Sequence, residues 1–330
     1  MSTTIRLFSF PLIFTFLWAC TGDSDRRPDV SGIAMPVKIR RLERELFKLS
    51  SQESVRNFLR QNSLFAENFL QSSQYPHDSV LVNRLYRMVN DRNLDTLFQQ
   101  TQAAFGDLSG LEKEFAEAFR YVKYYYPQFH PPQIYTLVSG FGTDLFVSDS
   151  LIVIGLDYYL GDRSKYRPDV PNYIQRRYRL EYLVPSVITL LSQSYNATDL
   201  LDHTLLAEMV FYGKAYEFTA AMLPDAPDSL IIGYTGKQLA GTQANQGLIW
   251  AHFVEKKLLY ETSTMVKTKY TGERPYTAEI SPDCPGAIGR WLGWRIVQEY
   301  RQRHPDVTLP GLMKNKDAKS IFSESKYKGK

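Results

Sequence analysis

Two apolar segments that follow each other closely constrain the fold of this chain more than any other feature. The first covers residues 178–191 and carries charge only at its start. The second begins at residue 205 and reads LLAEMVFYGKAYEF. A short polar stretch separates them. We therefore expect two largely buried helices, joined by a short loop, around which the rest of the chain is arranged.

This helix pair resembles the frame of zinc peptidases of the HExxH type, in which two His and one Glu from two helices surround a metal ion. If Glu181 is aligned with the general base, the two His positions fall on Leu180 and Val184. The third ligand position falls on Tyr212, just before Gly213. Leucine and valine side chains cannot ligate zinc. We therefore predict a zincin-like helix pair without metal ligands, and neither a metal nor another cofactor.

Two carboxylates, Glu181 and Glu208, remain on the two predicted helices, and two interpretations of them are open. If burial raised the pKa of one, the pair could act as acid and base in a metal-independent hydrolase of the cell envelope. Alternatively, each is paired with a nearby group, with Lys214 and Tyr216 as candidates, in a relict cleft that also contains Tyr212. We favour the second interpretation, a pseudo-peptidase with no catalytic residues.

The first twenty residues predict export and lipidation. One Arg precedes an apolar stretch of about twelve residues, whereas spanning a bilayer takes roughly twenty. The stretch ends in Leu-Trp-Ala-Cys, which resembles the bacterial lipobox. We expect a signal peptide at residues 1–19, lipid attachment at Cys20 and a flexible tether over residues 20–35. The alternative is an ordinary signal peptide followed by a chance Cys.

Composition limits the classes of function open to the mature chain. The formal net charge of +4 is small and the Lys and Arg residues are scattered, so we expect no nucleic-acid partner. The chain is 44% hydrophobic, which is enough for a substantial core. Once Cys20 is lipidated only Cys284 remains, so we expect no disulfide within the chain.

Residue periodicity predicts one α+β domain over residues 36–330, mainly helical with a small antiparallel sheet. The clearest expected helices cover residues 51–69, 107–126, 244–260 and 288–303, and residues 78–102 are expected to form two helices or one kinked helix. We expect three strands in a meander, at residues 133–139, 144–148 and 150–156. A further extended segment is expected at residues 230–235, and a loop at residues 265–276.

The expected helix at residues 288–303 is apolar on nearly every side, which is typical of a buried helix. We expect Asp283 to cap it. Gly289 and Gly293 lie four residues apart beside two Trp residues, and close packing against another helix explains them without a ligand.

Several segments together resemble the GldB family of gliding-motility lipoproteins of Bacteroidota. They are GLDYYLG (155–161), PNYIQRRY (171–178), LAEMVFYGKAY (206–216), LIWAHFVE (248–255), SPDCPGAIGRWLGWRIV (281–297) and IFSESKYK (321–328). From these segments we single out, as motif or packing residues, Trp250, Gly286, Gly289, Trp291, Gly293, Trp294 and Arg295.

This resemblance implies a non-catalytic lipoprotein of the cell envelope that supports gliding motility and the associated secretion of surface proteins. Its partners would be the membrane, through the lipid anchor, and other gliding or secretion proteins of the envelope. The implied location is the periplasmic face of the outer membrane rather than the inner membrane. The family supplies no catalytic residues to assign to this chain.

We expect Cys20→Ala to release the protein from the membrane into the soluble fraction. Each buried CH₂ of an acyl chain contributes about 0.8 kcal/mol to membrane binding, so the loss of several chains removes the anchor. Envelope fractionation, together with labelling by a radioactive fatty acid, measures the change. An unchanged membrane fraction of the variant would contradict lipidation at Cys20.

Overall fold

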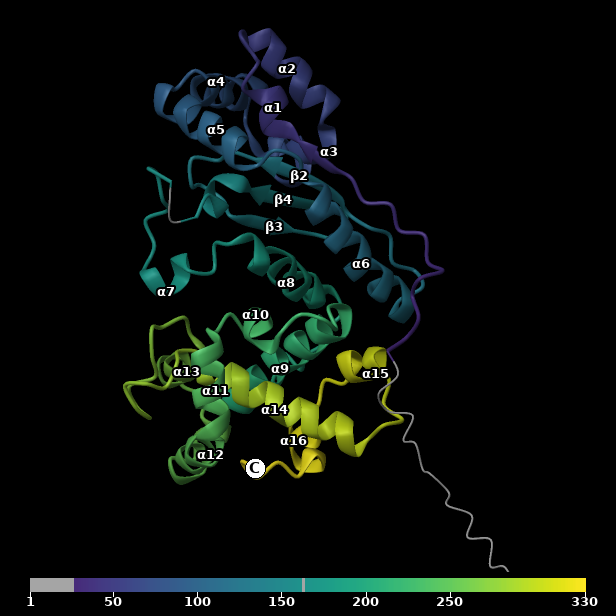
Figure 1. Ribbon diagram of the computed structural model, residues 1–330, viewed down its shortest axis with the longest axis vertical. Coiled ribbons are helices and arrows are strands. Elements are labelled where there is room, and N and C mark those ends of the chain that lie inside the picture. Colours follow the sequence, from purple (N-terminus) through teal and green to yellow (C-terminus); the bar gives the residue numbers. More distant parts are fainter. Residues whose placement is uncertain (1–26, 162–163) are drawn as a thin grey trace, which may run out of the picture.

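The computed structural model describes residues 27–161 and 164–330 (Figure 1). The predicted signal peptide, Cys20 and the first part of the predicted tether lie outside these described residues. Within the described part, a small four-stranded sheet lies between two groups of helices. The predicted α+β class with a mainly helical chain is confirmed.

The sheet is mixed, so the predicted antiparallel meander is wrong in its pairing. Its strands are β1 (Ile39–Arg41), β2 (Gln133–Leu137), β3 (Leu145–Val147) and β4 (Leu151–Gly155), in the order β1-β2-β4-β3. Strand β2 pairs in parallel with β1 and β4, and only β3 and β4 are antiparallel. The reason is burial: β4 is buried along its whole length, as central parallel strands are, whereas the short, half-exposed β3 takes the edge.

Helices from the first third of the chain cover one face of the sheet (Figure 1). They are α1 (Leu42–Leu46), α2 (Gln52–Gln61), α3 (Ser63–Asn68), α4 (Asp78–Val89) and α5 (Arg92–Ala104). Leu42 and Phe65 from this group pack with Tyr135 and Val153 of the sheet. The helix expected at residues 51–69 is divided into α2 and α3, and residues 78–102 form two helices, one of the two outcomes expected for them. One division has a clear cause, because the Asp91 carboxylate caps the start of α5.

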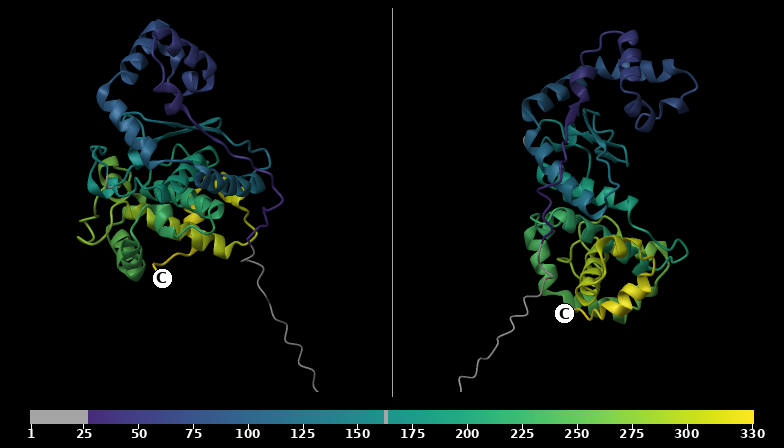
Figure 2. Two further views of the ribbon diagram at one scale, coloured as in Figure 1. Left: turned by 45° about the horizontal axis from the view of Figure 1, so that its top comes forward. Right: turned by 90° about the vertical axis from the view of Figure 1, so that its right-hand side faces the viewer.

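The opposite face of the sheet contacts the main core, and Figure 2 shows the C-terminal helices at the far end of the molecule from α2 and α4. The longer helices of this part are α6 (Ser109–Tyr125), α8 (Leu180–Leu191), α9 (Leu205–Met222) and α14 (Ile288–Arg303). The shorter ones are α7 (Asn172–Gln175), α10 (Asp228–Ile232), α11 (Gly236–Ala244), α12 (Gln246–Glu255), α13 (Thr264–Thr271), α15 (Leu309–Lys314) and α16 (Ala318–Ser325).

Two short segments differ from the prediction. The segment expected to be extended contains α10, because Pro227 and the left-handed Gly233 bound a single helical turn. The expected loop at residues 265–276 begins with α13. No helix in residues 27–161 and 164–330 has the length and apolar character that crossing a bilayer requires.

Helix α9 packs mainly against α14, and glycines bring the two backbones into contact. A Cβ atom on Gly293 would lie 1.8 Å from the carbonyl oxygen of Met209. One on Gly213 would lie 2.4 Å from the carbonyl oxygen of Gly293. The bounds predicted for α14 are correct, but the Asp283 cap is wrong, because the helix begins after the left-handed Ala287.

We expect Gly293→Ala to destabilise the fold by about 1–3 kcal/mol, since the added methyl group meets rigid backbone rather than a flexible side chain. Chemical denaturation of the purified protein measures the change. Gly241→Ala on the exposed α11 is the matched control, because a Cβ atom there has nothing within 4 Å. The control should gain about 0.5–1 kcal/mol from helix propensity. Equal stability of the two variants would contradict close packing at Gly293.

Candidate functional site

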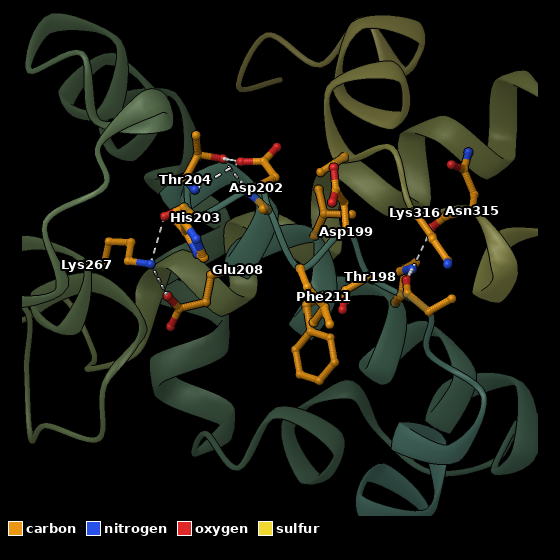
Figure 3. Close-up of a pocket in the computed structure, with 16 residues that line it drawn as sticks. Thr198, Asp199, Asp202, His203, Thr204, Glu208, Phe211, Lys267, Asn315 and Lys316 are labelled. Atoms are coloured by element: carbon orange, nitrogen blue, oxygen red, sulfur yellow. Dashed lines mark hydrogen bonds and ion pairs between the residues drawn. The ribbon is translucent and has the colours of Figure 1, made fainter.

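A cavity of about 380 Å³ opens at the N-terminal end of α9, beside the segment that joins α15 to α16 (Figure 3). In Figure 3, Lys267 and Glu208 lie on one side, Asn315 and Lys316 lie on the other, and the ring of Phe211 lies between them. The remaining polar lining comes mainly from the loop before α9: Thr198, Asp199, Asp202, His203 and Thr204. The site therefore combines an aromatic floor with charges of both signs.

Glu208 is held by two neighbours from α13. The hydroxyl of Thr271 donates a hydrogen bond to its carboxylate at 2.6 Å, and the Lys267 ammonium lies 3.5 Å away. Lys267 also donates to the backbone carbonyl of His203 at 2.9 Å. This carboxylate thus has a cation and a hydroxyl as partners, but they are not the predicted Lys214 or Tyr216.

The residues predicted for a relict cleft do not line one cavity. Glu208 and Lys214 line the cavity, whereas Glu181, Tyr212 and Tyr216 do not. Glu181 is exposed at the start of α8, where it lies 3.8 Å from Arg179.

The two tyrosines lie against α14 instead. The Arg290 guanidinium lies 4.2 Å from the centre of the Tyr212 ring, and Tyr216 packs against Trp294. The two positions aligned with the His ligands also differ in their surroundings, because Val184 is buried in the core and Leu180 is 41% exposed. Within the described residues, no group of three His, Cys, Asp or Glu side chains is arranged to hold a metal ion.

Lys214 forms the inner wall of the cavity and joins three segments. Its ammonium donates to the backbone carbonyls of Ala197 at 2.6 Å, Asn315 at 2.8 Å and Met313 at 3.4 Å. These three acceptors match the three N–H groups of an ammonium. Burial lowers the pKa of Lys214 to about 8, so the side chain is still protonated near neutral pH. Lys214 therefore fixes the loop before α9 and the α15–α16 segment to α9.

A second polar cluster joins two of the sequence motifs. Arg290 donates to the carbonyl of Thr271 at 2.6 Å and to the Glu273 carboxylate at 3.0 Å. Arg177, from the PNYIQRRY segment, lies 2.7 Å from the other oxygen of Glu273. These two guanidinium groups hold the pKa of Glu273 below its usual value against the opposing effect of burial. Sequence analysis missed Glu273 because it follows α13 in a segment expected to be a loop.

The residues singled out as motif or packing residues have contacts within the fold. The indole N–H of Trp294 donates to Glu217 at 3.0 Å, and Trp291 is 1% exposed. Arg295 donates to Gln298 at 2.7 Å. The ring of Trp250 packs on Tyr327, with ring centres 5.4 Å apart.

The glycines of these motifs lie close to backbone. Cβ atoms on Gly286 and Gly289 would lie 1.9 Å and 3.1 Å from the carbonyl oxygens of Arg274 and Tyr270. Gly329 follows the last motif, and a Cβ atom on it would lie 2.6 Å from the Cβ atom of Trp250, so the C-terminal segment is packed onto α12.

The GLDYYLG motif organises the loop that follows β2. The buried Asp157 carboxylate accepts hydrogen bonds from the backbone N–H groups of Ser139 at 3.1 Å and Phe141 at 2.7 Å. Phe141 and the preceding Gly140 both have left-handed backbone conformations. Burial raises the pKa of Asp157, and the hydrogen bonds to its charged form oppose that rise. The motif therefore stabilises the loop that follows β2, and it does not contribute to the cavity.

Sequence analysis also missed most of the cavity lining. The lining residues come from the loop before α9, from α9 itself, from α13 and from the α15–α16 segment, which lie far apart in the chain. One available signal was the Leu200–Leu201 pair within an otherwise polar stretch.

Comparison with protein families gives a match over nearly the whole chain. A family model described as gliding motility protein GldB matches residues 23–329. This range includes all six segments that carried the resemblance, and every residue that lines the cavity. A search of curated proteins and a search of solved structures each find no significant match.

We expect Lys214→Met to destabilise the fold by about 1–3 kcal/mol at neutral pH, because the partly buried carbonyl groups of Ala197 and Asn315 lose their Lys214 donor. The effect should also depend on pH. The folded-state pKa of about 8 lies below the ordinary value of 10.5, so the unfolded chain binds more protons between these values. The contribution of Lys214 to the free energy of unfolding should therefore increase from about pH 8 to pH 10.5.

Denaturation of the wild type and of Lys214→Met across this pH range measures the difference. Lys237→Met, at an exposed position on α11, is the control and should show no such trend. A stability difference between wild type and Lys214→Met that stayed constant from pH 8 to pH 10.5 would contradict the lowered pKa.

Proposed function

The chain belongs to the GldB gliding motility family, and we propose that it acts in gliding as a non-catalytic, lipid-anchored envelope protein that binds other proteins. The family match supports the role in gliding, and the predicted lipobox supports attachment through Cys20. We extend the proposal to support of surface-protein secretion from the periplasmic face of the outer membrane. Descent from a zinc peptidase stays a prediction.

The cavity at the start of α9 carries the proposal of a binding role. Its volume of about 380 Å³ accommodates a few side chains of a partner rather than a whole domain. Glu208 and Lys267 satisfy each other's charge, whereas Lys316 has no ion pair within the described part of the chain. Phe211 supplies an apolar surface between them. Such a mixture suits a short peptide segment with an apolar side chain and an acidic group.

The arrangement of the carboxylates supports a non-catalytic role. An acid and a base that act on one substrate must both reach it. Glu208 lines the cavity, whereas Glu181 is exposed elsewhere and pairs with Arg179. The hydrolase interpretation, which requires the two to act together, therefore has less support than binding.

We expect Phe211→Ala to abolish gliding in a gliding host whose own copy of the gene is deleted, because it removes the apolar surface of the cavity. Gliding speed and colony spreading measure the effect, with protein level and membrane fraction as checks. Tyr276→Ala is the matched control, since Tyr276 is 48% exposed and does not line the cavity.

A Glu181→Gln variant tests catalysis in the same host. Wild-type gliding is expected, whereas loss of gliding in a folded and localised Glu181→Gln protein would contradict a non-catalytic role. Normal gliding of Phe211→Ala would contradict binding through this cavity.

A further inference from the structure

One surface loop exposes two adjacent leucines. Leu200 and Leu201 are 83% and 86% exposed, more than any other large apolar side chain in the described residues. Burying a leucine contributes roughly 1.5–3 kcal/mol, so leaving two in water does nothing for the stability of the fold. Exposed apolar groups that gather on one surface feature mark interaction sites. We therefore expect the two leucines to contact another molecule.

The loop is held in one conformation by its own polar groups. The Asp199 carboxylate accepts a hydrogen bond from the backbone N–H of Leu201 at 2.9 Å. The Asp202 carboxylate accepts from the backbone N–H and the hydroxyl of Thr204 at 3.0 and 2.7 Å. The leucines are thus presented on an ordered turn, which reduces the entropy that binding would cost.

Neighbouring segments also fix the loop to the body of the protein. The buried Lys214 ammonium holds the carbonyl of Ala197 before the leucines, and Lys267 holds the carbonyl of His203 after them. The surface beside this loop is hollowed, and the two hollows share Asp199, Asp202 and Lys316 in their lining. Leu200 lines the cavity of about 380 Å³, and Leu201 lines a second hollow of about 640 Å³.

The carboxylates beside the leucines favour a protein over a membrane as the occupant, although Lys316 lines both hollows. Asp199 and Asp202 flank the two leucines, and anionic lipid headgroups would repel both. Asp202 has Lys319 at 4.0 Å, but Asp199 has no cation partner in the part of the chain that the structure describes. The Asp199 carboxylate, which accepts the Leu201 N–H but has no cation beside it among the described residues, matches a Lys or Arg on a partner protein better than it matches a bilayer.

We propose that the loop of residues 198–204 inserts Leu200 and Leu201 into an apolar pocket of a partner protein that has a Lys or Arg beside it for Asp199. A central apolar anchor with a charged rim is the arrangement that concentrates binding energy in protein interfaces. The proposal rests on the proposed binding role and names the element that supplies the contact. The second hollow, which Leu201 lines, would then contact residues that surround the apolar pocket of the same partner.

Site-specific photocrosslinking in intact cells tests the proposal. A benzophenone amino acid replaces Leu201 in the full-length protein, and the control replaces Leu248, which is 70% exposed on α12. A discrete protein adduct is expected from position 201 and not from position 248. Asp199→Asn keeps an oxygen that accepts the Leu201 N–H but removes the charge, and it should reduce the adduct about tenfold. Lipid adducts, no adduct, or an adduct unaffected by Asp199→Asn would overturn the proposal.

Gliding gives an independent readout that separates this inference from the proposed function. Leu200→Ser with Leu201→Ser should leave the thermal unfolding temperature unchanged, because both side chains are exposed, and should abolish gliding. Leu248→Ser is the control and should glide normally. If the double variant glides while Phe211→Ala does not, the loop proposal fails alone. If both glide, the proposed binding role fails with it.

Discussion

The close crossing of α9 and α14 is the interaction on which the rest of this structure depends. Gly213 and Gly293 let the two backbones touch, and any side chain at either position would meet a carbonyl group of the other helix. With the helices in contact, the rings of Tyr216 and Trp294 pack side by side. The Thr204 side chain caps the start of α9 shortly before this crossing, so the loop and cavity at the N-terminal end of α9 lie close to it.

Charged side chains then attach distant segments to this crossing. Lys214 donates hydrogen bonds to carbonyl groups of the loop before α9 and of the α15–α16 segment. Glu273, which follows α13, forms ion pairs with Arg290 of α14 and with Arg177. A buried ammonium or guanidinium is costly without partners, so each one specifies the arrangement of the segments around it. The sequence motifs thus have an internal explanation, and the candidate binding surface is the loop and cavity that they hold in place.

Local sequence patterns predicted the helices and strands of this protein better than they predicted which of them pair or pack together. The bounds of α14 followed from its apolar character, and β2, β3 and β4 from their alternation and turns. The parallel pairing of β2 with β4 did not follow from these patterns. In an antiparallel meander β3 would lie between β2 and β4, whereas in this sheet β4 lies between β2 and β3, and both orders are compatible with the same alternation and turns along the chain. For the same reason, the packing of Tyr212 on Arg290 could not be read from spacing along α9, since Arg290 lies on another helix.

Composition and periodicity were sufficient for the helical class and for the buried nature of α9 and α14. Six motif segments carried the resemblance to the GldB family, which the family match bears out. These properties depend on residues close together in the chain. The cavity, the partners of Glu208 and the anchored Leu200–Leu201 loop came from the folded arrangement alone. They require contacts between the loop before α9, α13 and the α15–α16 segment, and the geometry of such contacts is set by packing over the whole domain rather than by any one stretch of sequence.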